Sequence, residues 1–268
     1  MTASRPARLI ELPEVDSTNL HARRLIEAGE TEPFSVRADV QLAGRGRLGR
    51  SWISPAGGVW LTVACPTARS PSESEPVPLL AALAAHATIE QLLPDAQRAE
   101  LRIKWPNDIL HAGRKLAGIL CERVAKTGRA WTLVGIGRNA DVDVESLGVT
   151  TRHPVSLRTL VERAQIDPSA IGHRLADALH GALAEFNAEG LPRGTMQALA
   201  DRLAWIDQPV TLRRAGSAGG EPVITGTLAG VDARGRAVIR TDQGHKHVIS
   251  GDLDEHTLRL EPAQQSDP

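Results

Sequence analysis

The chain has 268 residues and a formal net charge of −1, with 41% hydrophobic and 24% charged residues. This length allows one large domain and a small one, and the near-neutral charge excludes the general basic surface typical of nucleic-acid-binding and membrane-surface proteins. Cys65 and Cys121 stand alone with no CxxC motif, which argues against a disulfide framework and a structural zinc site. With no apolar signal core or membrane-length run, we expect a cytoplasmic protein with neither membrane nor nucleic-acid partners.

Hydrophobic periodicity predicts a β-sheet backed by helices over residues 1–206. Strands are expected at 9–12, 34–40, 59–65, 101–105, 115–124 and 130–136, with the last two joined as a hairpin. Helices are expected at 17–28, 79–93, 156–163, 168–186 and 194–205. The DSTN sequence at 16–19 favours a helix start, because its short side chains accept hydrogen bonds from first-turn N–H groups.

After Trp205 the sequence changes to short β-like runs separated by glycine-rich turns. This pattern predicts a small β-barrel or β-sandwich over 207–262, and the polar tail at 263–268 is expected to be disordered. We therefore expect an α+β protein with a small second domain.

The stretch GRGRLGR, at 44–50, combines three glycines with three arginines. Glycine lets a backbone approach a ligand closely, and the arginine fork matches phosphate or carboxylate oxygens, so the stretch is a candidate anion site. A solvated turn is about equally common for such a loop. An RGG-type nucleic-acid arm does not fit the neutral composition, and GxxxxGK[ST] does not occur here. GIGRNA, at 135–140, matches GxGxxA, but the acidic segment after it lacks the helix that would bind pyrophosphate.

A second polar cluster begins with KWPND, where Lys104 ends a strand and Pro106 fixes a turn before Asn107 and Asp108. Lys115 follows in KLAGIL, where Gly118 lets a ligand approach the strand backbone. Each residue alone fits a solvated strand end or an ordinary turn. Together with the arginine loop, they favour a site that binds anions.

These motifs, with DSTN, QLAGRGRLGRSW and GIGRN, occur in the order and approximate spacing found in biotin protein ligases, and the resemblance covers nearly the whole chain. It implies a mixed sheet like that of class II aminoacyl-tRNA synthetases, and an SH3-like C-terminal barrel. The implied reaction joins biotin to the α-phosphate of MgATP, giving biotinyl-5′-AMP and pyrophosphate. The biotinyl group then passes to a lysine of a biotin carboxyl carrier protein. With only about fifteen residues before Asp16, we expect a ligase without the family's DNA-binding repressor domain.

The resemblance also implies the site residues. Placing a carboxylate against a polyphosphate requires cations, which Arg47, Arg50, Lys104 and Lys115 supply. Asp108 is the candidate that orients or deprotonates the carrier lysine, completing the catalytic set. The biotin-binding positions are Ser17, Thr18, Asn19, Gln41, Gly44, Arg45, Arg47, Lys115 and Gly118. The ATP and adenylate positions are Arg47, Arg50, Trp52, Lys104, Asn107, Lys115 and Asn139, with magnesium carried by the ATP phosphates and its protein ligands left open.

The glycines of the arginine loop fit a segment that opens for substrates and then excludes water, so 44–52 is expected to be mobile without ligand and ordered with the adenylate. Two residues depart from the family pattern: Leu42 replaces the usual Thr, and Arg138 replaces an apolar residue, so we expect its side chain to point away from the core. The HKH triplet at 245–247 is expected on an exposed strand rather than at a metal site. Lipoate ligation and a non-catalytic biotin or adenylate sensor remain alternatives, and the protein is expected to be a monomer or a homodimer.

Overall fold

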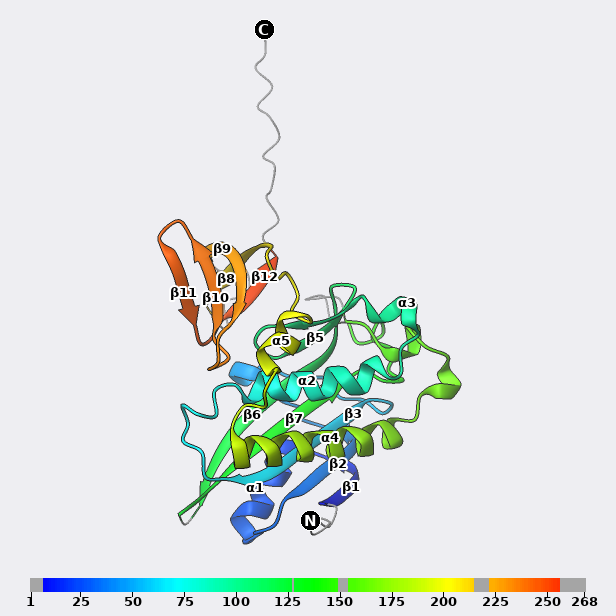
Figure 1. The fold of residues 1–268 in the computed structure, drawn as a ribbon. Coiled ribbons are helices and arrows are strands. Elements are labelled where there is room, and N and C mark those ends of the chain that lie inside the picture. The colour runs from blue at the N-terminus through cyan, green and yellow to red at the C-terminus, as the bar shows by residue number, and fades with distance from the viewer. Residues whose placement is uncertain (1–6, 127, 149–153, 215–221, 256–268) are drawn as a thin grey trace.

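The computed structural model describes residues 7–126, 128–148, 154–214 and 222–255, which form two β-sheets and the helices around them (Figure 1). The first sheet has the order β1-β2-β3-β7-β6-β5-β4. Only the β1–β2 pair is parallel, so the sheet is mixed. Its strands are β1 (Arg8–Val15), β2 (Phe34–Gln41), β3 (Val59–Thr67), β4 (Leu101–Lys104), β5 (Asp108–His111), β6 (Arg114–Lys126) and β7 (Arg129–Arg138).

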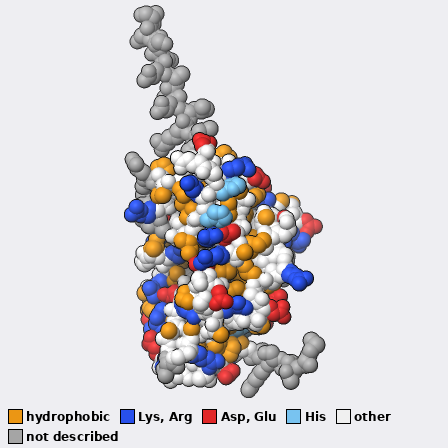
Figure 2. All heavy atoms as spheres, turned by 60° about the vertical axis from the view of Figure 1, so that its left-hand side comes forward, with side chains coloured by type: hydrophobic (Ala, Val, Ile, Leu, Met, Phe, Trp, Pro, Cys, Tyr) orange, Lys and Arg blue, Asp and Glu red, His pale blue; other side chains and the backbone are white. Residues whose placement is uncertain are grey.

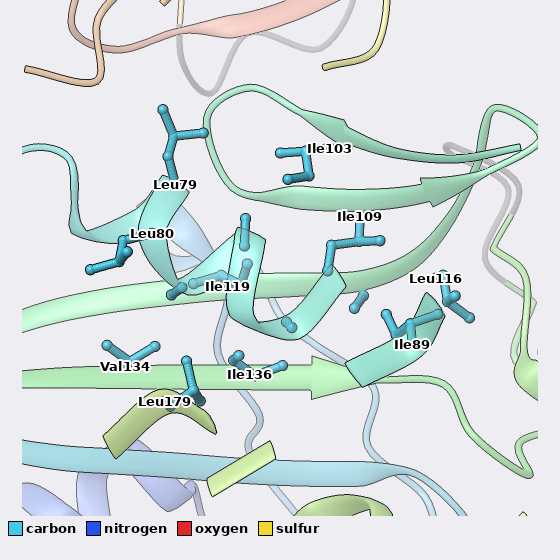
Figure 3. Close-up of a cluster of buried hydrophobic side chains, with 14 of the residues drawn as sticks. Leu79, Leu80, Ile89, Ile103, Ile109, Leu116, Ile119, Val134, Ile136 and Leu179 are labelled. Carbon is cyan, nitrogen blue, oxygen red and sulfur yellow. The ribbon is translucent and has the colours of Figure 1, made fainter. Parts of the chain in front are cut away.

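Helices cover both faces of this sheet. On one face α2 (Val77–Glu90) and α4 (Pro168–Glu189) pack on the main core, together with the shorter α5 (Thr195–Ala200). Figure 3 shows leucine, isoleucine and valine side chains of α2, β4, β5, β6, β7 and α4 filling this space. On the other face α1 (Thr18–Ala28) packs on a smaller core around Phe34 and Trp131. The short α3 (Asp95–Arg98) precedes β4.

Alternation along the strands decides which side chains face α1. Leu133 belongs to the α1 core and Val134 to the main core, so Gly135 and Gly137 lie on the α1 face. On β3, Ala64 likewise marks the α1 face, which places Thr62 there. Polar residues and glycines thus occupy the α1 face beside the helix N-terminus, where apolar packing stops.

The second sheet contains β8 (Pro209–Arg213), β9 (Pro222–Val231), β10 (Ala237–Thr241), β11 (Gly244–Val248) and β12 (Asp252–Glu255), in the order β11-β10-β9-β8-β12. All its pairs are antiparallel. Within the described residues β11 and β12 do not pair, so closure into a barrel stays a prediction. Figure 2 brings this part of the molecule toward the viewer and shows acidic, basic and hydrophobic side chains mixed over the face.

Polar contacts join the second sheet to the first domain. The Trp105 indole N–H donates to the Gly235 carbonyl at 2.9 Å, and Arg234 pairs with Glu75 at 2.8 Å. Both contacts involve the β9–β10 turn, which therefore lies against the segment before α2. In the described part of the chain, none of the helices has the length and apolar character needed to cross a membrane.

Several sequence expectations are confirmed and others are wrong. The six strands, the 115–136 hairpin and the long helices occur as expected. The helix expected at 156–163 is wrong, because this segment holds only short 3-10 turns at Leu157–Thr159 and Arg163–Gln165. Strands β5 and β12 were not anticipated, and the tail at 263–268 lies outside the described residues.

Arg138 departs furthest from expectation. Its side chain does not point away from the core but is fully buried, with Nη2 donating to Thr88 Oγ1 at 2.7 Å. On β7 it shares the face of Val134 and Ile136, which is the face covered by α2. In contrast, His245 and Lys246 lie on an exposed strand as expected, and no group of three metal-binding side chains occurs in the described residues.

Candidate functional site

A cavity of about 380 Å³ opens on the α1 face of the first sheet. Its wall combines the N-terminus of α1, the 45–53 loop, the β4–β5 turn, and strands β6 and β7. Most of the residues expected at the site line it: Ser17, Thr18, Asn19, Gln41, Arg45, Arg47, Arg50, Trp52, Asn107, Asp108, Lys115, Gly118 and Asn139. Segments more than a hundred residues apart in the sequence thus meet around one space.

One end of the cavity carries a chain of hydrogen bonds among hydroxyl, amide and carboxylate groups. The Thr18 backbone N–H and hydroxyl both donate to Gln41 Oε1, at 2.9 and 3.1 Å. Gln41 Nε2 donates to Ser54 Oγ at 2.9 Å, and Asn19 Nδ2 donates to Glu122 Oε2 at 2.8 Å. The buried Thr62 hydroxyl lies 2.8 Å from Thr18 Oγ1 and 2.6 Å from Asn19 Oδ1, and it can donate to one of them at a time. Donors and acceptors are therefore fixed in place before a ligand arrives.

Ser17 is the N-cap residue of α1, but its side chain makes no capping hydrogen bond. The capping contact expected from the sequence is therefore not made by this residue. The serine is only 2% exposed and lines the cavity. Beside it, hydrogen bonds from Arg24 hold the pKa of Asp16 at about 2, so this carboxylate is ionised at neutral pH.

The Trp52 ring, which lines the cavity, lies on a surface formed by two glycines. Gly118 on β6 and Gly137 on β7 are direct partners in the sheet. A Cβ atom on Gly137 would lie 2.5 Å from Trp52 Nε1, and one on Gly118 would lie 3.1 Å from the same ring. Side chains at these positions would displace the indole. Lys115 Nζ lies 4.9 Å from the ring centroid, within cation–π range.

The other end of the cavity holds cations that face carboxylate or amide oxygens. Lys115 Nζ lies 2.7 Å from Asp108 Oδ1, and Arg47 donates to Asn107 Oδ1 at 3.0 Å. The Asn107 amide nitrogen in turn donates to the Ile119 carbonyl at 2.6 Å, which fixes the direction of its oxygen. These contacts bring the arginine loop and the KWPND turn together, as expected from the sequence.

Two loop arginines pair with acidic residues that the sequence did not single out. Arg50 donates to Asp252 Oδ2 at 2.7 Å, and Arg45 lies 3.8 Å from Glu122 Oε1. Asp252 belongs to β12, so the second sheet contributes a residue to the cavity wall. No sequence signal marks Asp252. Thr62 and Glu122 could have been noticed, since each interrupts an apolar strand with a polar side chain on the α1 face.

Lys104 and Gly44 are the two expected site residues that do not line the cavity. The Lys104 side chain is nearly buried, forms an ion pair with Asp254 at 2.6 Å and lies over the Trp205 ring. Gly44 permits close packing instead, because a Cβ there would lie 2.3 Å from the Trp52 carbonyl oxygen.

A magnesium ion fits the donors available here. Asp108 and Asn107 offer a carboxylate and an amide oxygen on the same turn. Mg²⁺ in nucleotide sites is usually held by one or two carboxylates, water and the substrate phosphates, rather than by a complete protein cage. The donor set therefore suits an ion delivered with a nucleotide.

Comparison with known proteins places the chain in a family. The model of the biotin/lipoate A/B protein ligase family matches residues 13–139, and that of the biotin protein ligase C-terminal domain matches 206–254. The biotin–[acetyl-CoA-carboxylase] ligase of Paracoccus denitrificans is 32% identical over 255 residues, covering 90% of this chain and 98% of that protein. The bifunctional ligase/repressor BirA of Salmonella typhimurium is 31% identical over 250 residues, which cover 90% of this chain and 72% of that protein.

Solved structures agree with the sequence matches. The biotin protein ligase from Aquifex aeolicus in complex with biotin and ATP has a TM-score of 0.71 and 25% identity, covering 93% of this chain and 99% of that one. Its likeness extends over both sheets, since the aligned share includes nearly the whole chain. Together with the two family models and the Paracoccus denitrificans relative of matching length, this shows that the chain is a ligase of the biotin protein ligase family.

Proposed function

We propose that the protein forms biotinyl-5′-AMP from biotin and MgATP and transfers the biotinyl group to a lysine of a biotin carboxyl carrier protein. The observation that carries this proposal is the division of one cavity into an end of hydroxyl and amide hydrogen-bonding groups and an end where Arg47 and Lys115 meet. Biotin has the same two parts, a ureido ring that needs donors and acceptors and a carboxylate that needs cations. The Aquifex aeolicus relative, solved with biotin and ATP, supports both substrates.

In the first step a biotin carboxylate oxygen attacks the α-phosphorus, and the bond to pyrophosphate breaks. Arg47 and Lys115 reduce the repulsion between the two anions and stabilise the charge that develops between them. Gln41, Thr18 and Asn19 bind and orient the ureido ring. The Trp52 ring provides a flat surface for adenine. Arg50 and Lys104 are proposed to contact the phosphates, which for Lys104 requires exchange of its Asp254 partner.

Magnesium would be held by the ATP phosphates, and Asp108 and Asn107 are the protein residues that could supply further oxygen ligands. When bound, the ion neutralises phosphate charge and orients the leaving pyrophosphate. The Asn107 oxygen is directed by the hydrogen bond from its amide nitrogen to Ile119, and it would become free for the ion once Arg47 exchanges it for the substrate phosphates.

In the second step the carrier lysine attacks the biotinyl carbonyl, and AMP leaves. A lysine ammonium, with a pKa of about 10.4, must first lose a proton. Asp108 is proposed to orient or deprotonate it, in exchange for its ion pair with Lys115. Asp108→Asn should slow transfer from preformed biotinyl-AMP by at least about tenfold. Unchanged transfer by Asp108→Asn would show that Asp108 has no such role.

The function is tested by incubating the protein with a biotin carboxyl carrier domain, biotin and MgATP, and measuring biotin attached to the carrier. Labelling should require all components and should be lost in Arg47→Ala. Lipoate with a lipoyl domain is the parallel assay, and preference for lipoate would refute the choice of substrate. Binding of biotin without pyrophosphate release would identify a sensor instead. Location in the cytoplasm and the absence of repressor function stay predictions.

A further inference from the structure

Glu122, on β6, lies beside the cavity without being part of its wall. It shares the α1 face of the sheet with Leu120, which does line the cavity. Its two carboxylate oxygens have different neighbours. Oε2 accepts a hydrogen bond from Asn19 Nδ2 at 2.8 Å, whereas Oε1 faces the guanidinium groups of Arg23 at 3.7 Å and Arg45 at 3.8 Å. One carboxylate therefore connects the first turn of α1 with the arginine loop.

The partners of the Asn19 side chain decide which way its amide points, because its oxygen and nitrogen have nearly the same shape. An ionised carboxylate and a backbone carbonyl can only accept hydrogen bonds. Glu122 Oε2 at 2.8 Å and the Leu120 carbonyl at 3.5 Å therefore both require the nitrogen on their side. The Thr62 hydroxyl can donate or accept, so it imposes no orientation by itself. Glu122 is the closer and charged acceptor, and it contributes most to the choice.

This orientation turns the Asn19 oxygen toward Thr62 Oγ1, at 2.6 Å. The Thr62 hydroxyl must then donate its proton to Asn19 rather than to Thr18. The same oxygen lies against Gly135 in the cavity wall, where a Cβ atom would come within 2.2 Å of it. An amide oxygen has two lone pairs, so one of them remains for a ligand that donates an N–H group.

The opposite orientation of the amide is disfavoured. It would set the Asn19 oxygen against the Glu122 carboxylate, and two acceptors cannot share a hydrogen bond. Leaving a largely buried polar group without its partner corresponds to a change of roughly five- to 150-fold in an equilibrium constant. Without Glu122, only the Leu120 carbonyl, at 3.5 Å, would still select the orientation. The amide could then present either atom to a ligand.

We propose that Glu122 is a positioning residue for the biotin ureido ring, because it holds the Asn19 amide so that the amide oxygen accepts a ureido N–H. This inference rests on the proposed ligase function. Glu122 acts through Asn19 and does not itself touch the substrate. The dithiolane ring of lipoate has no N–H group, so the same arrangement favours biotin over lipoate.

The test exchanges the donor and the acceptor of this pair. Asn19→Asp keeps an oxygen that can accept from Thr62 and from the ligand, but it sets a second carboxylate against Glu122. Glu122→Gln then supplies the missing donor through its amide nitrogen, so the double variant should recover biotin binding. If the Asn19 nitrogen instead served the ligand, Asn19→Asp would lose binding with either residue at position 122.

Biotin affinity would be measured by calorimetry. Asn19→Asp should raise the Kd at least about thirtyfold, and adding Glu122→Gln should recover at least about tenfold, a coupling within the range of residues in contact. Glu122→Gln alone should cost less than about fivefold, because glutamine can turn its oxygen toward Asn19 and the distant arginine pairs contribute little. Glu27→Gln, exposed on α1, is the control and should change the Kd less than about threefold. Absence of recovery in the double variant would overturn the proposal.

A second cycle covers an Asn19→Asp variant that fails to fold, which thermal unfolding would reveal. Glu122→Met removes the acceptor without adding a charge and should raise the Kd at least about fivefold. In an Asn19→Ala background the same change should have less than about a twofold effect. Equal effects in both backgrounds would overturn the proposal, because Glu122 would then act through Arg45 or the fold. If the unmodified protein binds no biotin, the proposed function fails and this inference with it, whereas normal biotin binding without coupling refutes the inference alone.

Discussion

Replacing Arg138 with methionine should stabilise the protein. The guanidinium is fully buried between β7 and α2, and no carboxylate in the described residues pairs with it. Its Nε and Nη1 atoms have no hydrogen-bond partner there. Methionine keeps an unbranched, flexible stem in the same space and removes the charge. The Thr88 hydroxyl would remain satisfied, because it donates to the Ala85 carbonyl at 2.8 Å.

The size of the effect follows from the cost of burying the charge. Burial, and secondarily the nearby charge of Arg174, lowers the pKa of Arg138 from its ordinary value to about 9. At about 1.4 kcal/mol for each pH unit, this fall corresponds to roughly 5 kcal/mol as an upper bound. Loss of the bond to Thr88 and of some packing offsets part of it. We expect a net gain of about 1–3 kcal/mol in the free energy of unfolding, and a rise in Tm of several degrees.

Thermal unfolding between pH 6 and 8 is the assay. Unfolding returns the buried guanidinium to its ordinary pKa, so the unfolded chain binds more protons than the folded one only above about pH 9. The difference between Arg138→Met and the unmodified protein should therefore be constant over pH 6–8. Arg193→Met, at an exposed position, is the control and should change Tm little. A fall in stability of more than about 1 kcal/mol for Arg138→Met would refute the reasoning, since it would mean that the guanidinium has a stabilising partner.

Three further predictions concern the site, the partly buried His180 and the loop. Gly135→Ala would place a Cβ 2.2 Å from Asn19 Oδ1, so biotin affinity measured by calorimetry should fall at least tenfold, whereas Gly181→Ala, with open space around it, should not weaken binding. Burial lowers the pKa of His180 below 6.5, so the unfolded protein binds more protons than the folded one, and the free energy of unfolding falls as the pH drops below about 6.5. His180→Gln should reduce this dependence of the unfolding free energy on pH by up to about 1.4 kcal/mol per pH unit. An unchanged pH dependence would contradict the assignment. Biotinyl-AMP should protect the 44–52 loop from proteolysis, and equal cleavage with and without it would count against closure of the loop.

The parts of the fold that the sequence predicted are those with strong local patterns. Alternation and apolar runs located every strand of the first sheet except β5, and periodicity located α2 and α4. The segment at 156–163 was misread because its apolar residues pack individually under 3-10 turns. Leu157 and Val155 are buried there without forming the continuous face of a helix.

In the site, too, short sequence motifs predicted the residues well, whereas contacts between residues far apart in the chain could not be predicted. Motifs with several polar residues and glycines identified most of the cavity wall. Lys104 was assigned to the cavity because it precedes Pro106 in KWPND, but its side chain pairs with Asp254, which lies 150 positions along the chain. Asp252 could not be found from a motif, since β12 has only four residues and no sequence pattern of its own. Contacts of this kind depend on how the second sheet sits against the first.

Acidic side chains, one of them from the second sheet, balance the positive charge around the cavity. Arg50 faces Asp252, Arg45 faces Glu122, and Lys115 faces Asp108, so the cations are balanced before any anion binds. An anionic ligand would therefore have to replace the carboxylates that already pair with these cations. Each carboxylate released in this way would be hydrated again or would bind a metal ion or an ammonium group. The net binding free energy that each cation contributes is then smaller than the number of arginines implies. In return, several cations remain together around about 380 Å³ without the mutual repulsion that would otherwise open the cavity.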